Sequence, residues 1–242
     1  MSALPLVLLH GWGAHAGVWS EVIARMDLGH TVIAPDYPDE SGVDGSINEI
    51  LDRLAAMVPE QCVVAGWSLG GQLALQWARR YPRRIRKLIL VSTTPRFVTA
   101  PDWPHGMDFQ AFSQFGGLVA TDPAQALRRF LLLETQGDVQ ARTVVRQLEA
   151  ALGTRPNPEG PVLMRTLDWL RDTDLRPVLH DIVQPVLIVH GDRDRVTPLA
   201  AGEYLAAQLA DARLERMPGA AHAPFVSDPD AFSRLIAEFC NE

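Results

Sequence analysis

The chain has 242 residues, of which 47% are apolar and 21% are charged, and its formal net charge is −7. This length fits one large domain or one domain with an insertion, and the apolar share is enough for a sizeable core. The acidic balance argues against a nucleic-acid-binding protein, because such proteins normally carry an excess of basic residues.

Short apolar runs alternate with helical patterns through the first hundred residues. Segments 6–9, 31–34, 62–65 and 88–92 are short and bounded by Gly, Pro or polar residues, which predicts buried strands. Segments 17–26, 46–57 and 69–80 have helical periodicity, and Ser46 with Glu49 forms a capping box at the start of the second. The alternation predicts an α/β fold with a mostly parallel, doubly wound sheet that has helices on both faces.

The N-terminus and the two cysteines bear on where the protein works. Residues 1–3 lead directly into the run 6–9 without a basic segment, and that run is too short to span a bilayer. Cys62 and Cys240 have no metal-ligand or redox spacing, which predicts free thiols in a reducing compartment. We therefore expect a cytoplasmic, monomeric protein that has no membrane or nucleic-acid partner.

Residues 95–172 interrupt the alternation of strands and helices. A Pro- and Trp-rich segment, 99–106, precedes helical patterns over 111–115, 123–134, 139–152 and 160–170. The sheet pattern then resumes with strands predicted over 186–189 and 213–217 and helices over 200–210 and 230–240. We predict a core formed by residues 1–94 and 173–242, with 95–172 inserted as a helical lid over a pocket.

A G-x-S-x-G pentapeptide centred on Ser68 joins the predicted strand 62–65 to the predicted helix 69–80. This is the setting of a nucleophile elbow, in which a strained serine projects its hydroxyl above the edge of the sheet. Three fixed positions recur by chance, so an ordinary strand-to-helix turn is the alternative for the pentapeptide alone. The flanking elements favour Ser68 as the nucleophile.

A serine nucleophile needs a base to take its proton and an acid to orient that base. Asp194 follows the predicted strand 186–189, and His222 follows the predicted strand 213–217. Both therefore lie at carboxyl ends of strands, in the chain order Ser, acid, His that this architecture requires. Asp192 competes with Asp194 as the acid, and a solvated loop histidine is the alternative for His222.

Acyl transfer also requires hydrogen-bond donors for the developing oxyanion. The backbone N–H of Leu69 starts the elbow helix, and Trp12 lies in a glycine-containing run, 10–13, directly after the first predicted strand. We expect these two N–H groups to serve as donors, although a plain glycine turn is the alternative for the run. The sequence has no phosphate-binding glycine motif after a strand and no metal-ligand spacing, which predicts neither metal nor cofactor.

Arginines gather on two helices of the predicted lid, at Arg128, Arg129, Arg142 and Arg146. In an acidic protein this cluster is suited to an anionic partner, and a solvated helix face is an equal alternative. The apolar run 130–133 between them is either the core of the lid or the wall of an acyl tunnel.

Four motifs, at 10–13, 66–71, 191–194 and 220–225, together resemble the α/β-hydrolase superfamily. More narrowly, nearly the whole chain looks similar to the methyl ester esterases of biotin biosynthesis, including residues 102–104 and the lid run 129–135. The resemblance implies the α/β-hydrolase fold. It also selects Asp194 over Asp192, because the acid of that family stands three residues after the glycine at the strand end.

The resemblance implies roles for further residues. Trp12 and Leu69 would be the oxyanion donors, while Arg129, Arg142 and Arg146 would hold an acyl carrier protein. One arginine of the family is replaced by Gln125. The implied substrate-binding set is Trp12, Ser68, Leu69, Phe130, Leu131, Leu132, Leu133, Glu134 and His222.

The implied activity is hydrolysis of the methyl ester of a pimeloyl chain on an acyl carrier protein, through a Ser68–His222–Asp194 triad and an acyl-enzyme. A broad short-chain carboxylesterase, the lyase of menaquinone synthesis and a ligand-binding protein of the same fold are the alternatives, because one fold hosts many functions.

Overall fold

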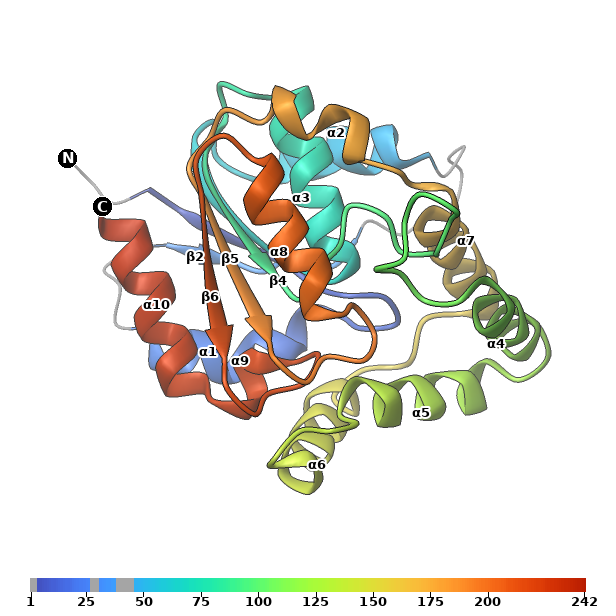
Figure 1. The fold of residues 1–242 in the computed structure, drawn as a ribbon. Coiled ribbons are helices and arrows are strands. Elements are labelled where there is room, and N and C mark those ends of the chain that lie inside the picture. The colour runs from blue at the N-terminus through green and yellow to red at the C-terminus, as the bar shows by residue number, and fades with distance from the viewer. Residues whose placement is uncertain (1–3, 27–30, 38–45) are drawn as a thin grey trace.

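The computed structural model describes residues 4–26, 31–37 and 46–242. Within these ranges the centre is a parallel six-stranded sheet in the order β2-β1-β3-β4-β5-β6. Figure 1 shows the sheet with helices packed around it. The strands are β1 (Leu6–Leu9), β2 (Val32–Ile33), β3 (Cys62–Trp67), β4 (Ile85–Val91), β5 (Val186–Gly191) and β6 (Ala212–Met217). The predicted fold class is confirmed.

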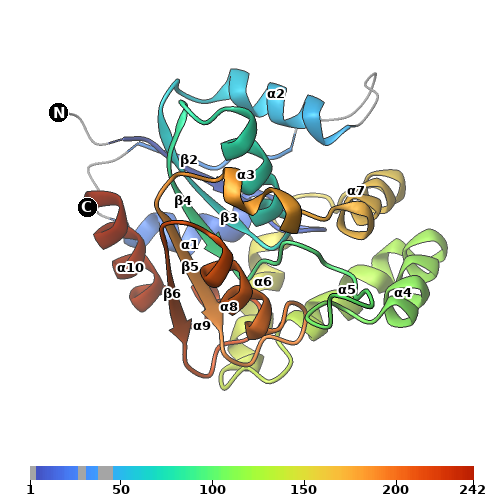
Figure 2. The same cartoon turned by 45° about the horizontal axis from the view of Figure 1, so that its top comes forward.

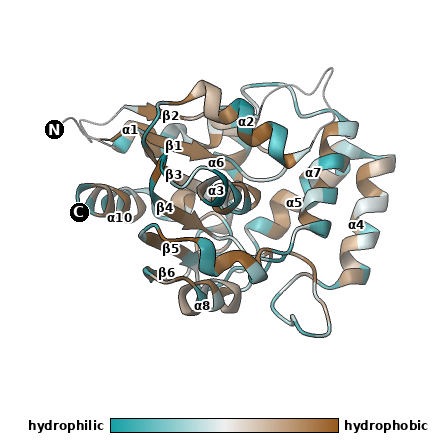
Figure 3. Ribbon diagram, turned by 90° about the horizontal axis from the view of Figure 1, so that it is seen from above, coloured by the Kyte–Doolittle hydropathy of each residue, from teal (hydrophilic) through white to brown (hydrophobic). Residues whose placement is uncertain are grey.

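Both faces of the sheet are buried, because successive residues of a strand point to opposite sides. In β1, Val7 and Leu9 belong to one apolar cluster, whereas Leu6 and Leu8 belong to another. Figure 3 shows the apolar strands lying between the helices. The first cluster is covered by α2 (Ile47–Met57), α3 (Leu69–Arg80) and α8 (Leu199–Gln208), and the second by α1 (Ser20–Arg25), α9 (Pro224–Ser227) and α10 (Pro229–Asn241).

Some elements differ in extent from the prediction. The helix expected over 17–26 is a 3₁₀-helix, η1 (Ala16–Trp19), followed by α1, and only Val32–Ile33 of the segment 31–34 is a strand. The helix predicted over 111–115 continues through two glycines as α4 (Phe109–Thr121). A Cβ at Gly116 would lie 3.7 Å from Leu167 of α7 (Gly160–Asp172), so the packing of α4 on α7 overrides the weak helix propensity of glycine there.

The inserted segment contains four α-helices in the part of the chain described. They are α4, α5 (Pro123–Glu134), α6 (Ala141–Leu152) and α7 (Gly160–Asp172). Figures 1 and 2 both place these helices together on one side of the sheet core. They occupy the range in which we predicted an insertion, 95–172, and the function of this segment as a lid stays a prediction.

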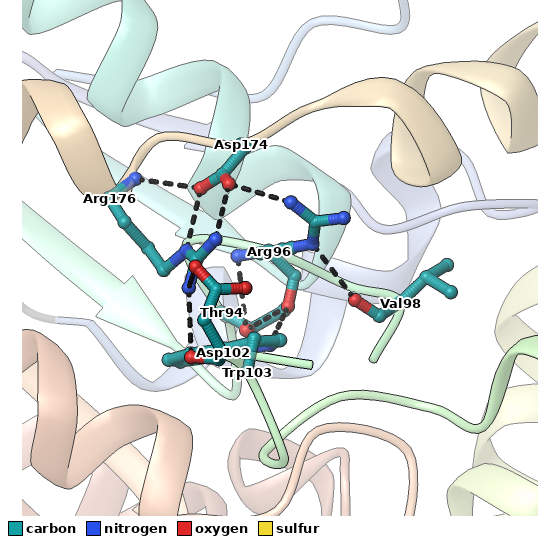
Figure 4. Close-up of polar contacts among 7 residues, drawn as sticks. All are labelled: Thr94, Arg96, Val98, Asp102, Trp103, Asp174 and Arg176. Atoms are coloured by element: carbon teal, nitrogen blue, oxygen red, sulfur yellow. Dashed lines mark hydrogen bonds and ion pairs between the residues drawn. The ribbon is translucent and has the colours of Figure 1, made fainter. Parts of the chain in front are cut away.

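The chain leaves the core and returns to it at a single neck, shown in Figure 4. Arg96 and Asp174 form an antiparallel bridge, and the Leu175 N–H donates to the Pro95 carbonyl at 2.9 Å. The Asp174 carboxylate accepts hydrogen bonds from Arg176 Nη2 and Arg96 Nη1, each at 2.7 Å. The hydrogen bonds from Arg176 and then from Arg96 outweigh partial burial and lower the pKa of Asp174 to about 2. The neck is therefore ionised and paired at neutral pH.

A 3₁₀-helix, η2 (Arg176–Asp181), precedes β5. Among the residues that the structure describes, no helix is long and apolar enough to cross a membrane. Cys62 is buried in β3 and Cys240 is partly buried in α10. Both cysteines are free thiols, as predicted.

Candidate active site

The strand order reverses direction between β1 and β3. From β1 the chain moves outward to β2, and from β3 it moves the other way to β4, β5 and β6. Open α/β sheets bind ligands at such a switch point, outside the carboxyl ends of the strands. Trp12 follows β1 and Ser68 follows β3, and Leu9 pairs with Gly66 in register. The two loops selected from the sequence therefore lie side by side at this crevice.

Ser68 occupies a sharp, strained turn between β3 and α3. Its φ and ψ are 54° and −117°, a conformation that costs a residue with a side chain about 1–3 kcal/mol. The turn is held in place because the Ser68 N–H donates to the Val91 carbonyl at 2.9 Å and Thr93 Oγ1 donates to the Ser68 carbonyl at 2.6 Å. The geometry is that of a nucleophile elbow.

The glycines beside Ser68 are required by the close approach of backbone to backbone. A Cβ at Gly66 would lie 2.2 Å from the carbonyl oxygen of Gly70. A Cβ at Gly70 would lie 2.5 Å from the carbonyl oxygen of Leu9. Neither neighbour is a flexible side chain, so only glycine fits at either position.

Asp194 and His222 form a buried pair below this turn. His222 Nδ1 lies 2.8 Å from Asp194 Oδ2, and both side chains are 0% exposed. The other oxygen, Oδ1, accepts from the backbone N–H groups of Val196 at 2.8 Å and Thr197 at 2.9 Å. Asp192, the competing acid, instead accepts from the backbone N–H of Gly219 at 2.7 Å.

The charge state of the pair follows from its surroundings. Burial raises the pKa of Asp194, but the charge of His222 and hydrogen bonds from His190 and His222 outweigh burial and hold that pKa below its usual range. An ionised carboxylate can only accept, so Nδ1 of His222 carries a proton. A neutral His222 therefore has its lone pair on Nε2, the atom that a general base needs.

His222 Nε2 is buried and has no hydrogen-bond partner among the described residues. Ser68 Oγ thus makes no hydrogen bond to it in this structure, and such contacts often tighten only when substrate binds. The two residues are nevertheless joined through Trp67, which directly precedes Ser68 and donates from Nε1 to the His222 carbonyl at 2.8 Å. The structure therefore brings the three proposed triad residues to one site.

The two candidate oxyanion donors, the N–H groups of Trp12 and Leu69, have no hydrogen-bond acceptor among the residues that the structure describes. Leu69 is the first residue of α3, so its N–H has no acceptor within the helix, and in the described part of the chain neither it nor the Trp12 N–H donates elsewhere. The Trp12 side chain is fixed by a hydrogen bond of 3.0 Å from Nε1 to the Leu163 carbonyl. Its ring meets that of Phe130 edge to face, with centroids 5.0 Å apart.

A cavity of about 210 Å³ adjoins Trp12 and Trp67. From α5 it is lined by residues spaced three, four and seven positions apart, as one side of a helix requires: Ala124, Leu127, Arg128, Phe130, Leu131 and Glu134. Glu134 is 4% exposed, so its carboxyl group is largely withdrawn from solvent. Burial, and then the charge of Asp194, raise the pKa of Glu134 well above its usual value.

The outer face of α5 borders a larger groove of about 800 Å³ between α5 and α6. Leu132 and Leu133 lie here, together with the arginines that the sequence assigned to carrier docking, Arg129, Arg142 and Arg146. These three arginines are exposed, and none forms an ion pair with any residue that the structure describes. The groove thus carries uncompensated positive charge.

Sequence reasoning assigned no role to Trp67, Thr197 or Asp138, although all three contact the triad or its loops. Thr197 donates from Oγ1 to Asp194 Oδ2 at 2.9 Å. Its position three residues after Asp194 was the available signal. The contact of Trp67 crosses 155 residues, and that of Asp138 with Ala221 crosses 83, so no local pattern reveals them.

Comparison with known proteins agrees with this geometry. The model of the alpha/beta hydrolase family matches residues 6–235. This chain belongs to the alpha/beta hydrolase family.

Curated relatives within this family are similar over nearly the whole chain. A pimeloyl-[acyl-carrier protein] methyl ester esterase of Aromatoleum aromaticum is 41% identical, with 98% of each chain covered. The protein of the same name from Yersinia enterocolitica is 38% identical, covering 98% of this chain and 93% of its own. The family resemblance stated from the sequence is confirmed.

Solved structures at lower sequence identity have the same fold. An esterase from Exiguobacterium antarcticum superposes with a TM-score of 0.87 at 22% identity, covering 100% of this chain and 93% of its own. A bromoperoxidase from Bacillus anthracis superposes with a TM-score of 0.86 at 19% identity, covering 99% and 92%. Since these two names describe different reactions, the fold alone does not select the chemistry.

Proposed function

We propose that this protein is a serine esterase that hydrolyses the methyl ester of a pimeloyl chain attached to an acyl carrier protein. The observation that carries the chemistry is the buried Asp194–His222 hydrogen bond of 2.8 Å beside a serine in a strained elbow. Support for the substrate comes from the names of relatives at 38–41% identity over 98% of the chain. The uncompensated arginines of the α5–α6 groove suit an acidic carrier.

In the proposed mechanism, Nε2 of His222 takes the proton of Ser68 as its Oγ attacks the ester carbonyl. The developing oxyanion is held by the N–H groups of Trp12 and Leu69, each of which is worth about 10²–10³ in rate. His222 then returns the proton to the departing methanol, which leaves Ser68 acylated. The same His222 activates a water molecule that hydrolyses the acyl-enzyme, with Asp194 stabilising the imidazolium in both steps.

Substrate selection in this proposal depends on how far the pimeloyl chain extends from the docked carrier toward Ser68. The carrier docks against Arg129, Arg142 and Arg146, while the pimeloyl chain passes into the cavity beside Phe130. Both the thioester and the methyl ester are cleavable, so the position of the carrier has to place the distal methyl ester at Ser68. Binding energy from the remote carrier is thereby used for orientation at the reacting carbonyl.

Two assays test the proposal in sequence. Wild type and Ser68→Ala are first compared on p-nitrophenyl butyrate, and we expect turnover that is lost in the variant. No turnover by either protein would indicate a ligand-binding protein. The second assay uses the methyl ester of pimeloyl-[acyl-carrier protein] and rescue of a biotin-requiring strain that lacks its own methyl esterase. Activity on the small ester without cleavage of the carrier-bound ester, and without rescue, would refute the substrate and favour a broad carboxylesterase.

A further inference from the structure

The connection between α5 and α6, residues 135–140, is bonded to the loop that carries His222. The Val139 N–H donates to the Gly219 carbonyl at 3.0 Å, and Gln140 Nε2 donates to the Ser227 carbonyl at 3.0 Å. At the end of α5, the carbonyl of Glu134 accepts from the N–H of His222 at 3.0 Å. The inserted helices therefore reach the backbone of the proposed base directly.

Asp138 lies at the centre of this contact. Its Oδ2 accepts from the N–H of Ala221 at 2.9 Å, one residue before His222. Its Oδ1 accepts from the N–H of Gln140 at 2.7 Å and from Ser227 Oγ at 3.2 Å. Asp138 is 8% exposed, so these hydrogen bonds are shielded from water. A single carboxylate thus connects the loop before His222, the end of α9 and the start of α6.

The backbone of His222 is consequently held from two sides. Trp67 Nε1 binds its carbonyl from the sheet core, while Glu134 and Asp138 bind its N–H and the preceding N–H from the inserted helices. Asp194 fixes only the ring, through Nδ1. The placement of Nε2 over the serine depends on both the ring and the backbone, and a displacement of about 1 Å can cost about 10²-fold in rate.

We propose that Asp138 is a positioning residue for His222, through which the α5–α6 connection sets the place of the general base. This inference rests on the proposed catalytic role of His222. Under this proposal the inserted segment has two roles: it holds His222 of the triad in position, and it offers a docking surface for the carrier. Loss of the Asp138 carboxylate should therefore reduce turnover of every ester, small or carrier-bound.

The test compares Asp138→Ala and Asp138→Asn with the control Asp122→Ala. Asp122 caps the other end of α5 by accepting from the Gln125 N–H at 2.9 Å, and within the described structure it forms no hydrogen bond with the His222 loop. Kinetics on p-nitrophenyl butyrate are normalised to active sites titrated with a fluorophosphonate that labels Ser68. This normalisation removes any effect of the folded fraction.

We expect kcat of Asp138→Ala to fall at least tenfold with KM changed less than twofold, whereas Asp122→Ala stays within twofold in both. Asp138→Asn keeps the size but offers one acceptor oxygen, so its kcat should lie between those of wild type and Asp138→Ala. If Asp138→Ala does not fold, the kcat of Asp138→Asn relative to wild type tests the proposal. A kcat per titrated site within twofold of wild type in the Asp138 variants, or an equal loss in Asp122→Ala, would overturn the proposal. Either result leaves the Ser68→Ala test of the esterase function untouched.

Discussion

The replacement Asp194→Asn tests the assignment of the acid most directly. Oδ1 of Asp194 accepts two backbone N–H groups, from Val196 and Thr197, so the carboxamide oxygen of the variant should occupy that side. The NH₂ group then takes the place of Oδ2, 2.8 Å from His222 Nδ1. Since the amide can only donate there, Nδ1 has to accept, and the ring proton moves to Nε2.

A His222 ring that is protonated at Nε2 cannot take the proton of Ser68. We therefore expect kcat on p-nitrophenyl butyrate to fall by about 10⁴, or about 5.5 kcal/mol in transition-state stabilisation, with little change in KM. The matched control is Asp192→Asn, whose carboxylate binds only the Gly219 N–H among the described contacts and should keep kcat within twofold. More than a tenth of wild-type kcat in Asp194→Asn, or an equal loss in Asp192→Asn, would refute the tautomer reasoning.

Three further predictions concern the elbow, the cavity and the groove. Gly70→Ala places a Cβ 2.5 Å from a backbone carbonyl oxygen and should lower the free energy of unfolding, measured in urea, by about 1–3 kcal/mol. The control Gly117→Ala has open space around its Cβ and should raise the free energy of unfolding by up to about 1 kcal/mol. An unchanged free energy of unfolding in Gly70→Ala would contradict the close approach of the backbone. Because folding raises the pKa of Glu134, the folded state holds its proton at pH values where the unfolded state has lost it. The wild type should therefore lose stability relative to Glu134→Gln as pH rises above 4.5, the ordinary pKa of the group, by about 1.4 kcal/mol per pH unit until the folded pKa is reached. Parallel curves of stability against pH from pH 5 to 8 would exclude a raised pKa. The double change Arg142→Glu and Arg146→Glu should reduce kcat/KM for the carrier-bound ester about tenfold and leave p-nitrophenyl butyrate unaffected; equal loss on both substrates would argue against docking at the groove.

Local patterns account for what could be predicted from the sequence. The elbow at Ser68 needs only a strand, a sharp glycine turn and a helix that are contiguous in the chain, and the hydrophobic period of the strands specifies a sheet buried on both faces. The roles of Trp67 and Asp138 could not be predicted, because both residues bond to partners that are distant in the sequence. For the same reason the predicted helix ended at residue 115, whereas α4 continues to Thr121. Gly116 packs near Leu167, and helix propensity does not include such a tertiary contact.

The neck at Arg96 and Asp174 brings the two ends of the insertion together, so the helices between them form a cassette that can be excised without opening the sheet. A short turn replacing residues 97–173 would leave all six strands uninterrupted, although it would remove residues such as Leu163 and Leu167 that share an apolar cluster with Leu9. Such a truncated enzyme would nevertheless lack the two acceptors that hold the backbone N–H groups of Ala221 and His222. Any lid exchanged between relatives must therefore supply an equivalent carbonyl and carboxylate, in addition to a matching pocket, before the transplanted enzyme regains full turnover.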